Sequence, residues 1–283
     1  MADIVFINGN YYSASEAKIS VFDRGLLFAD SVYEVIPVYN GHLFYLEKHL
    51  KRLAHSLGSI RITQPDIQWQ SVLEELIAQN GGGDMQIYLQ VTRGNQGLRK
   101  HDISSQITPT VIAFTMHNHF STFEEKQQGL HAKLLEDIRW QRCDIKTTAL
   151  IGNVLLNDDA LSSGADTAIL TRNGFLTEGV AANLFLVDQR NVIRTPPLTH
   201  FCLPGVTRDV IIELIKSLSW PLSEDNIPTE ELFNAKELWI TSASKEIYPI
   251  IRVNEQLIGN GQVGHYWRQL NEKYQQLIKK LYD

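Results

Sequence analysis

The sequence predicts an α+β protein of two domains, with a smaller α/β domain at the N-terminus and a larger, strand-rich domain at the C-terminus. A chain of 283 residues has the length of two domains of ordinary size. Its strand patterns outnumber the helical crossovers that a doubly wound parallel sheet would need. A polar, weakly patterned stretch starts at His117, so we predict domains over 1–117 and 124–283, joined by a linker over 118–123.

The first third of the chain is predicted to form strands around a long helix. Asn8-Gly9 and Asn40-Gly41 stand between apolar, aromatic-rich runs, which is the pattern of β-hairpins. Leucines at 46, 50, 53 and 57 recur at the spacing of one helix face. A second helical pattern covers 66–79 and stops before three glycines, and strands are predicted over 85–94 and 110–116.

The second half of the chain alternates strands and helices. We predict a strand over 130–140, a helix over 153–164, and hairpins that turn at Asn173-Gly174 and at 188–191. An amphipathic helix over 206–218, a strand over 237–243 and a closing helix over 264–281 complete the order.

Composition indicates a soluble, cytoplasmic protein whose partner is a small molecule or a second copy of the chain. Apolar residues make up 43% and charged residues 20%, as in ordinary globular proteins. A net charge of −6 argues against nucleic-acid binding, and no apolar run is long enough to span a bilayer. Cys143 and Cys202 form neither a disulfide framework nor a metal-binding pattern, so we expect reduced thiols and no metal.

Lys146 is a candidate for nucleophilic chemistry, in the segment RWQRCDIKTTALIGN. A lysine amine attacks a carbonyl only when it is neutral, so this role requires burial or a cationic neighbour. Arg139 and Arg142 are close in sequence and could provide the positive charge. The polar flanks suit a solvated surface lysine as well, and spacing alone does not separate the two interpretations.

Three further segments carry groups that could bind an anionic ligand. Glu178 ends a predicted strand, where it is either a solvated turn residue or an acid that pairs with a protonated ring nitrogen. Pro204-Gly205 opens the helix at 206, whose free N–H groups and dipole suit a phosphate as well as an ordinary N-cap. The segment ITSASKE offers hydroxyl and N–H donors after a strand, and Arg52 could clamp a phosphate from the first long helix.

In their joint order, these segments resemble the fold-type-IV enzymes that use pyridoxal 5′-phosphate (PLP). The strings are RWQRCDIKTTALIGNVL, LTEGVAANLFLV, LPGVTRDVI and TSASKEIYPI. This class IV aminotransferase family includes D-amino acid aminotransferases, branched-chain aminotransferases and aminodeoxychorismate lyases. The resemblance runs nearly from end to end, and it implies PLP as the cofactor and the two-domain fold of D-amino acid aminotransferases.

The resemblance also assigns roles to residues of this chain. It makes Lys146 the catalytic, Schiff-base lysine and Glu178 the partner of the pyridine nitrogen. The remaining cofactor contacts that it implies are Arg52, Val206 and Thr207 for the phosphate, Leu203 against the ring, and the turn at Ser242 and Ala243. Many members have a phosphate-binding threonine where this chain has Ala243, so a backbone N–H there, with the hydroxyl of Ser242 or Ser244, would have to replace it.

Tyr33, Arg99 and His101 are the candidates for substrate binding. Alternate residues of an extended loop point to one side, so Arg99 and His101 could share a face, although a solvated basic loop has the same pattern. A guanidinium, an imidazole and a phenol would supply convergent donors for one carboxylate. The combination resembles the carboxylate trap of D-amino acid aminotransferases, which implies a homodimer whose Arg99 and His101 act in the partner subunit's site.

The function that follows from the resemblance is transamination between a D-amino acid, such as D-alanine, and a 2-oxo acid, such as 2-oxoglutarate or pyruvate. A branched-chain L-amino acid aminotransferase would use the same cofactor residues without needing Arg99 and His101. An aminodeoxychorismate lyase would release pyruvate without any amino acceptor. A catalytically silent relative that only binds PLP is the alternative outside enzymes.

Overall fold

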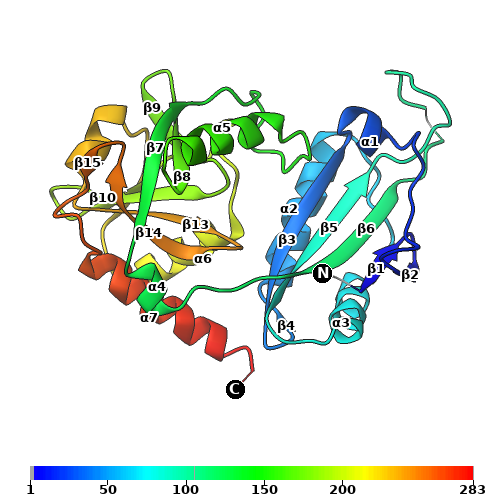
Figure 1. Cartoon of the computed structure of the whole chain (residues 1–283), viewed down its shortest axis with the longest axis horizontal. Coiled ribbons are helices and arrows are strands. Elements are labelled where there is room, and N and C mark those ends of the chain that lie inside the picture. Colours follow the sequence, from blue (N-terminus) through cyan, green and yellow to red (C-terminus); the bar gives the residue numbers. More distant parts are fainter. Residues whose placement is uncertain (1–2, 105, 283) are drawn as a thin grey trace. The chain divides into compact units, whose positions relative to one another are not determined.

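The chain folds into two compact units in the computed structural model, which describes residues 3–104 and 106–282 (Figure 1). Of these residues, unit 1 contains 3–104, 106–119, 145–150 and 281–282, and unit 2 contains 120–144 and 151–280. The segment 145–150 therefore packs with the N-terminal part, whereas the sequence pattern placed it in the C-terminal domain. Its Ile145 is buried in the core of unit 1, and Thr147 forms a β-bridge with Val32.

Unit 1 is an antiparallel sheet covered by helices. Its strands are β1 (Ile4–Ile7), β2 (Asn10–Ser13), β3 (Ser31–Tyr39), β4 (His42–Leu43), β5 (Met85–Thr92) and β6 (Thr110–His117). Its helices are α1 (Arg24–Phe28), α2 (Leu46–Ser59) and α3 (Trp69–Gln79). The strand order is β2-β1-β6-β5-β3-β4, and every neighbouring pair is antiparallel.

The Asn-Gly pairs form the predicted hairpin turns of unit 1. Asn8 and Gly9 have φ values of 47° and 92°, and Asn40 and Gly41 have 50° and 82°. Two successive positive φ values match the twist of a two-residue hairpin, and asparagine and glycine tolerate them best. Both hairpin predictions are confirmed by the pairing of β1 with β2 and of β3 with β4.

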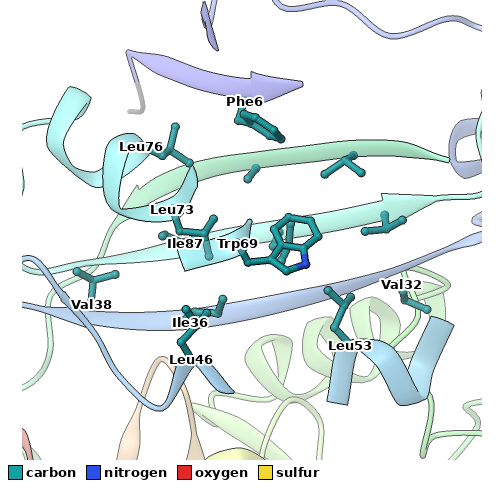
Figure 2. Close-up of a cluster of buried hydrophobic side chains, with 14 of the residues drawn as sticks. Phe6, Val32, Ile36, Val38, Leu46, Leu53, Trp69, Leu73, Leu76 and Ile87 are labelled. Atoms are coloured by element: carbon teal, nitrogen blue, oxygen red, sulfur yellow. The ribbon is translucent and has the colours of Figure 1, made fainter. Parts of the chain in front are cut away.

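The core of unit 1 lies between its sheet and helices α2 and α3 (Figure 2). Leu53 of α2 and Leu73 of α3 pack in the same buried cluster as Val32, Ile36 and Ile87 of the strands. Of the predicted leucine stripe, helix α2 buries Leu46, Leu53 and Leu57, whereas Leu50 is half-buried. It also buries a polar row at His49, Arg52 and Ser56. A buried polar row requires partners inside the unit.

Unit 2 is a mixed nine-stranded sheet with helices around it. Its strands are β7 (Leu130–Glu136), β8 (Thr167–Arg172), β9 (Phe175–Gly179), β10 (Asn183–Val187), β11 (Ile193–Thr195), β12 (Leu222–Glu224), β13 (Glu237–Ser242), β14 (Glu246–Val253) and β15 (Gln256–Leu257). Its helices are α4 (Phe123–Lys126), α5 (Ile151–Ser162), α6 (Val206–Ser217), the 3₁₀ helix η1 (Thr229–Asn234) and α7 (His265–Lys279). The order β12-β11-β10-β13-β14-β7-β8-β9, with β15 beside β14, combines parallel and antiparallel pairs.

The α+β class is confirmed, and the elements differ from prediction mainly at their ends. The helix expected over 66–79 begins at Trp69, and the helix expected over 153–164 runs from Ile151 to Ser162. The strand expected over 130–140 ends at Glu136. Beyond it, the Arg139 side chain donates to Glu178 and the Arg139 carbonyl accepts from Arg172. No helix in the described part of the chain combines the length and the apolarity needed to cross a membrane.

Candidate active site

The backbone of Lys146 is fixed along strand β3 of unit 1. The carbonyl oxygen of Lys146 accepts a hydrogen bond from the Tyr33 amide at 2.9 Å, and its own amide donates to the Ser56 hydroxyl of α2 at 3.3 Å. The adjacent Thr147 hydroxyl donates to the Ser31 carbonyl at 3.1 Å. These hydrogen bonds therefore hold the segment that carries Lys146 beside strand β3.

The side chain of Lys146 lies over an aromatic ring. Its Nζ is 4.2 Å from the centroid of the Tyr33 ring, and Tyr33 in turn stacks on Tyr88 with 5.5 Å between ring centroids. Burial, followed by the neighbouring Tyr33, raises the pKa of Tyr88 to about 12. Two of the predicted site residues, Lys146 and Tyr33, are thus brought together in one unit.

Arg52 is paired inside unit 1 with a glutamate that the sequence analysis did not single out. The Nε and Nη2 atoms of Arg52 donate to the two oxygens of Glu34 at 2.8 and 2.6 Å, and His49 Nδ1 lies 2.8 Å from Glu34. Burial acts to raise the pKa of Glu34, but Arg52 and His49 outweigh it and lower this pKa to about 2. Burial also lowers the pKa of His49, and Lys146 adds to that effect. Glu34 therefore fixes the plane of the Arg52 guanidinium.

Arg99 and His101 both contact the ring of Phe28, the last residue of α1. The Arg99 guanidinium lies 5.1 Å from the Phe28 centroid, and the His101 ring lies 5.2 Å from it. Both side chains are exposed. Arg99 and His101 therefore lie against the same phenyl ring, as expected for alternate residues of an extended loop.

Arg24 holds the backbone of this same loop. Its Nη1 donates to the carbonyl oxygens of Lys100 at 2.6 Å and Asp102 at 3.4 Å, and its Nη2 donates to that of His101 at 3.3 Å. Its Nε pairs with Asp30 at 2.8 Å, and the side chain is nearly fully buried. A buried guanidinium that satisfies several loop carbonyls restricts the conformations open to that loop.

Glu178 in unit 2 is a fully buried acid that accepts three hydrogen bonds. Arg139 Nη1 donates to its Oε1 at 2.6 Å, and the Leu203 amide and Asn183 Nδ2 donate to its Oε2 at 3.0 and 3.1 Å. Burial raises the pKa of Glu178, and Arg139 opposes this rise. An ionised carboxylate has about four acceptor positions, so the three bonds leave one for a further donor.

Arg139 is itself held by an acid. It donates from Nε and Nη2 to the two oxygens of Asp137 at 2.9 Å each, and Arg172 approaches Asp137 at 3.2 Å. Arg139 and Arg142 are close to Lys146 in sequence and were candidates for its cationic neighbours. In the structure Arg139 pairs with Asp137 and Glu178, and Arg142 pairs with Asp144 at 2.9 Å.

The start of α6 has the features of an anion-binding helix terminus. Gly205 is the N-cap and provides no side chain to cap the first turn, and Val206 and Thr207 are buried there. Leu203, two residues before Gly205, is half-buried, and its amide donates a hydrogen bond to Glu178. Glu178, Leu203, Val206 and Thr207 thus belong to one unit.

The turn after β13 carries the remaining candidates. The Ser242 hydroxyl lies 3.2 Å from that of Ser244 and accepts from the Lys245 amide at 3.1 Å, so it supports the turn itself. Ala243 is half-buried within this turn. Asn183 and Thr241 are paired residues of β10 and β13, so the turn starts next to the strand that carries Asn183.

Sequence reasoning missed Glu34, His49, Arg24 and Asn183. Their only sequence signal was a polar residue at a position that helix or strand periodicity would bury, as for His49 beside the leucine stripe of α2. Cys143 and Cys202 are buried and free, and burial raises the pKa of both thiols. In the described part of the chain, no group of three or more His, Cys, Asp or Glu side chains could hold a metal ion.

Residues 31–253 match the family model described as amino-transferase class IV. The chain belongs to the class IV aminotransferase family. Among its curated relatives, the D-alanine aminotransferase of Bacillus licheniformis is 39% identical over 92% of either chain. The D-alanine aminotransferase of Staphylococcus haemolyticus is 35% identical over 97% of this chain and 98% of the relative.

Solved structures of class IV aminotransferases share the fold. The branched-chain amino acid aminotransferase of Escherichia coli matches with a TM-score of 0.91 and 25% identity, over 98% of this chain and 95% of the other. A branched-chain enzyme of T.th., solved with pyridoxamine 5′-phosphate, matches with a TM-score of 0.89 and 25% identity over 98% and 94%. Class IV aminotransferases depend on PLP. The open acceptor position of Glu178 and the uncapped start of α6 suit a pyridinium N–H and a phosphate respectively.

Proposed function

We propose that this enzyme exchanges the amino group between a D-amino acid, such as D-alanine, and a 2-oxo acid, with PLP as its cofactor. The observation that carries this proposal is the position of Lys146 Nζ, 4.2 Å from the ring of Tyr33. Lys146 is the proposed catalytic lysine, and Tyr33 is a proposed ligand of the substrate carboxylate. Since that carboxylate is bonded to Cα, a lysine beside its ligand is suitably placed for proton transfer at Cα.

The proposed cofactor contacts follow from the chemistry of each group. Lys146 would hold the aldehyde carbon of PLP, Glu178 would accept from the pyridine nitrogen, and Leu203 would pack against the ring. The phosphate would be bound by Arg52, Val206, Thr207 and the turn at Ser242 and Ala243. When bound, PLP supplies an electron sink for the bond that breaks at Cα. Glu34 acts in this scheme by holding the Arg52 guanidinium in one plane.

Proton transfer and carboxylate binding are assigned to different residues of the chain. The Lys146 amine, freed when the substrate amine replaces it on the cofactor, would take the Cα proton from one face and deliver it to the cofactor carbon that carries the amino group. The carboxylate is held by Tyr33, Arg99 and His101, whose combined geometry selects which face of Cα meets the lysine. The first 2-oxo acid then leaves, and 2-oxoglutarate or pyruvate accepts the amino group in the reverse sequence.

The active form is proposed to be a homodimer in which Arg99 and His101 serve the partner subunit's site. Leu98, next to Arg99, is 49% exposed, and Leu26, in the helix that carries Phe28, is 63% exposed. A subunit interface at this loop would cover these apolar side chains. The proposal also places the enzyme in the cytoplasm, where the free thiols of Cys143 and Cys202 stay reduced.

A substrate panel tests the proposal directly. Purified protein is expected to be yellow with PLP and to form 2-oxo acid from D-alanine with 2-oxoglutarate, but not from L-alanine. Turnover restricted to L-leucine or L-valine would contradict D-specificity and favour a branched-chain enzyme, the activity named for solved structures that share the fold. Pyruvate release from aminodeoxychorismate with no amino acceptor would identify a lyase. A yellow protein that turns over none of these substrates would indicate a silent relative that only binds PLP. A colourless protein that does not take up PLP would contradict the proposed enzyme altogether.

A further inference from the structure

Asn183, the first residue of β10, has one amide that contacts two segments assigned to the cofactor. Its Nδ2 donates to Glu178 Oε2 at 3.1 Å and to the Leu203 carbonyl at 2.8 Å, and it lies 3.4 Å from Cys202 Sγ. The Leu203 amide donates to the same Glu178 oxygen at 3.0 Å. These bonds form a closed ring. Glu178 accepts from the Leu203 amide, Asn183 donates to the Leu203 carbonyl, and Asn183 also donates to Glu178.

The other end of the same amide touches the start of helix α6. A Cβ atom added to Gly205 would lie 1.9 Å from Asn183 Oδ1, which is far inside contact distance. Gly205 has φ −69° and ψ 133°, a conformation that any residue adopts. Glycine is therefore required at this position by the close approach of the Asn183 side chain rather than by its backbone angles.

The surroundings leave Asn183 little freedom to move. All five residues of β10 are buried, and Asn183 itself is 4% exposed. It pairs in register with Thr241 of β13, one residue before Ser242. Since a buried amide must satisfy its donors, moving this side chain would remove one of the three donors to Glu178 and the amide donor to the Leu203 carbonyl.

We propose that Asn183 is a positioning residue that sets the orientation of Glu178 and the path of residues 203–205 together. Through this amide, the acid that faces the pyridine nitrogen and the helix start that faces the phosphate are aligned as one element. The inference rests on the proposed function, because it assigns meaning to Glu178 and α6 as cofactor contacts. It predicts that a change at Asn183 weakens PLP binding and alters the ionisation behaviour of the bound cofactor.

The test measures PLP affinity of the full-length protein after the cofactor has been removed. Asn183→Ala is expected to raise the dissociation constant of PLP about tenfold to hundredfold, which is the effect of one or two lost buried hydrogen bonds. The midpoint of the pH titration of the bound cofactor's visible absorbance should shift as well, because Glu178 loses one of its three donors. Asn271→Ala is the matched control, since Asn271 is equally buried in unit 2 but lies on α7 near Lys126 at 3.4 Å.

A second variant keeps the inference testable if Asn183→Ala does not fold. Gly205→Ala retains Asn183 and an unstrained backbone, and it should weaken PLP binding by pushing the amide away from Glu178. In the Asn183→Ala background, the same glycine change should have a much smaller effect, because the obstructing Oδ1 is gone.

The outcomes separate the inference from the proposed function. Failure of the wild-type protein to bind PLP would overturn the proposed function itself. Wild-type binding with an unchanged affinity in both Asn183→Ala and Gly205→Ala would overturn only the positioning role. Equal losses in Asn183→Ala and Asn271→Ala, or strictly additive effects at 183 and 205, would also overturn it.

Discussion

The amine of Lys146 lies over the ring of Tyr33, 4.2 Å from its centroid, although 112 residues separate the two in the chain. Their backbones are joined as well, since the Tyr33 amide donates to the Lys146 carbonyl at 2.9 Å. A strand thus positions both the lysine and the phenol. Backbone pairing with the distant strand β3, rather than a property of the lysine's own segment, therefore positions this amine.

Replacement of Lys146 by alanine should abolish catalysis while leaving the fold intact. We expect kcat to fall roughly 10²- to 10⁴-fold, the usual contribution of a positioned proton-transfer group. Lys48→Ala is the control, because the Lys48 amine also lies over a tyrosine ring, 5.7 Å from the centroid of Tyr45. Borohydride treatment followed by peptide mapping should attach PLP at Lys146 in the wild-type protein. Attachment at another lysine would contradict the assignment.

Mixed dimers can decide whether Arg99 acts across subunits. Lys146→Ala and Arg99→Leu subunits are each expected to be nearly inactive alone. If Arg99 serves the partner's site, a mixed dimer contains one site with both native residues, and activity returns when the two variants are unfolded and refolded together. If Arg99 acts within its own subunit, no site in the mixture is complete and activity stays absent.

Arg24→Met should weaken substrate binding without affecting the cofactor. The loss of hydrogen bonds to the carbonyls of Lys100, His101 and Asp102 frees the loop that carries Arg99. We expect KM for the amino acid to rise at least about tenfold, since three hydrogen bonds that hold the loop are lost, with the PLP dissociation constant unchanged. Arg190→Met is the control, because the Arg190 side chain is 82% exposed. A change in kcat alone would argue against a role in the loop.

Glu34 should make the stability of the protein depend on pH in the acid range. The pKa of Glu34 is lowered from 4.5 to about 2, because Arg52 and His49 outweigh the effect of burial. The resulting stabilisation is present above pH 4.5 and is lost as the pH falls towards 2, in total roughly 3 kcal/mol. Denaturant titrations from pH 6 to pH 2.5 should show this loss in the wild-type protein and much less of it in Glu34→Gln. The control is Glu47→Gln, on the exposed side of α2.

Much of the local structure could be predicted because it depends on neighbours in the chain. The Asn-Gly turns at Asn8 and Asn40 formed as predicted, since their positive φ values are a local property. Three of the four leucines of the α2 stripe are buried as their spacing indicated, and Leu50 is half-buried. Helix ends were less accurate, as at Trp69, because terminal residues depend on packing and capping as well as on periodicity.

The site residues could be named from their order along the chain, but their partners could not. Glu34 and Arg52 belong to a strand and a helix, and Asn183 reaches Leu203 across 20 residues. Each of these contacts depends on a register or a helix rotation that the sequence pattern does not encode locally. The assignment of 145–150 to unit 1 has the same origin, since it follows from a bridge between Val32 and Thr147.

The sequence by itself therefore determined the class of fold, the turns, the amphipathic faces and the set of chemical groups that resemble a PLP enzyme. Only the tertiary structure decided which polar side chains are buried together, such as Glu34 with His49 and Glu178 with Arg139. The physical reason is that buried charges are tolerated only with partners close in space. Those partners come from distant parts of the chain, so folding alone brings them together.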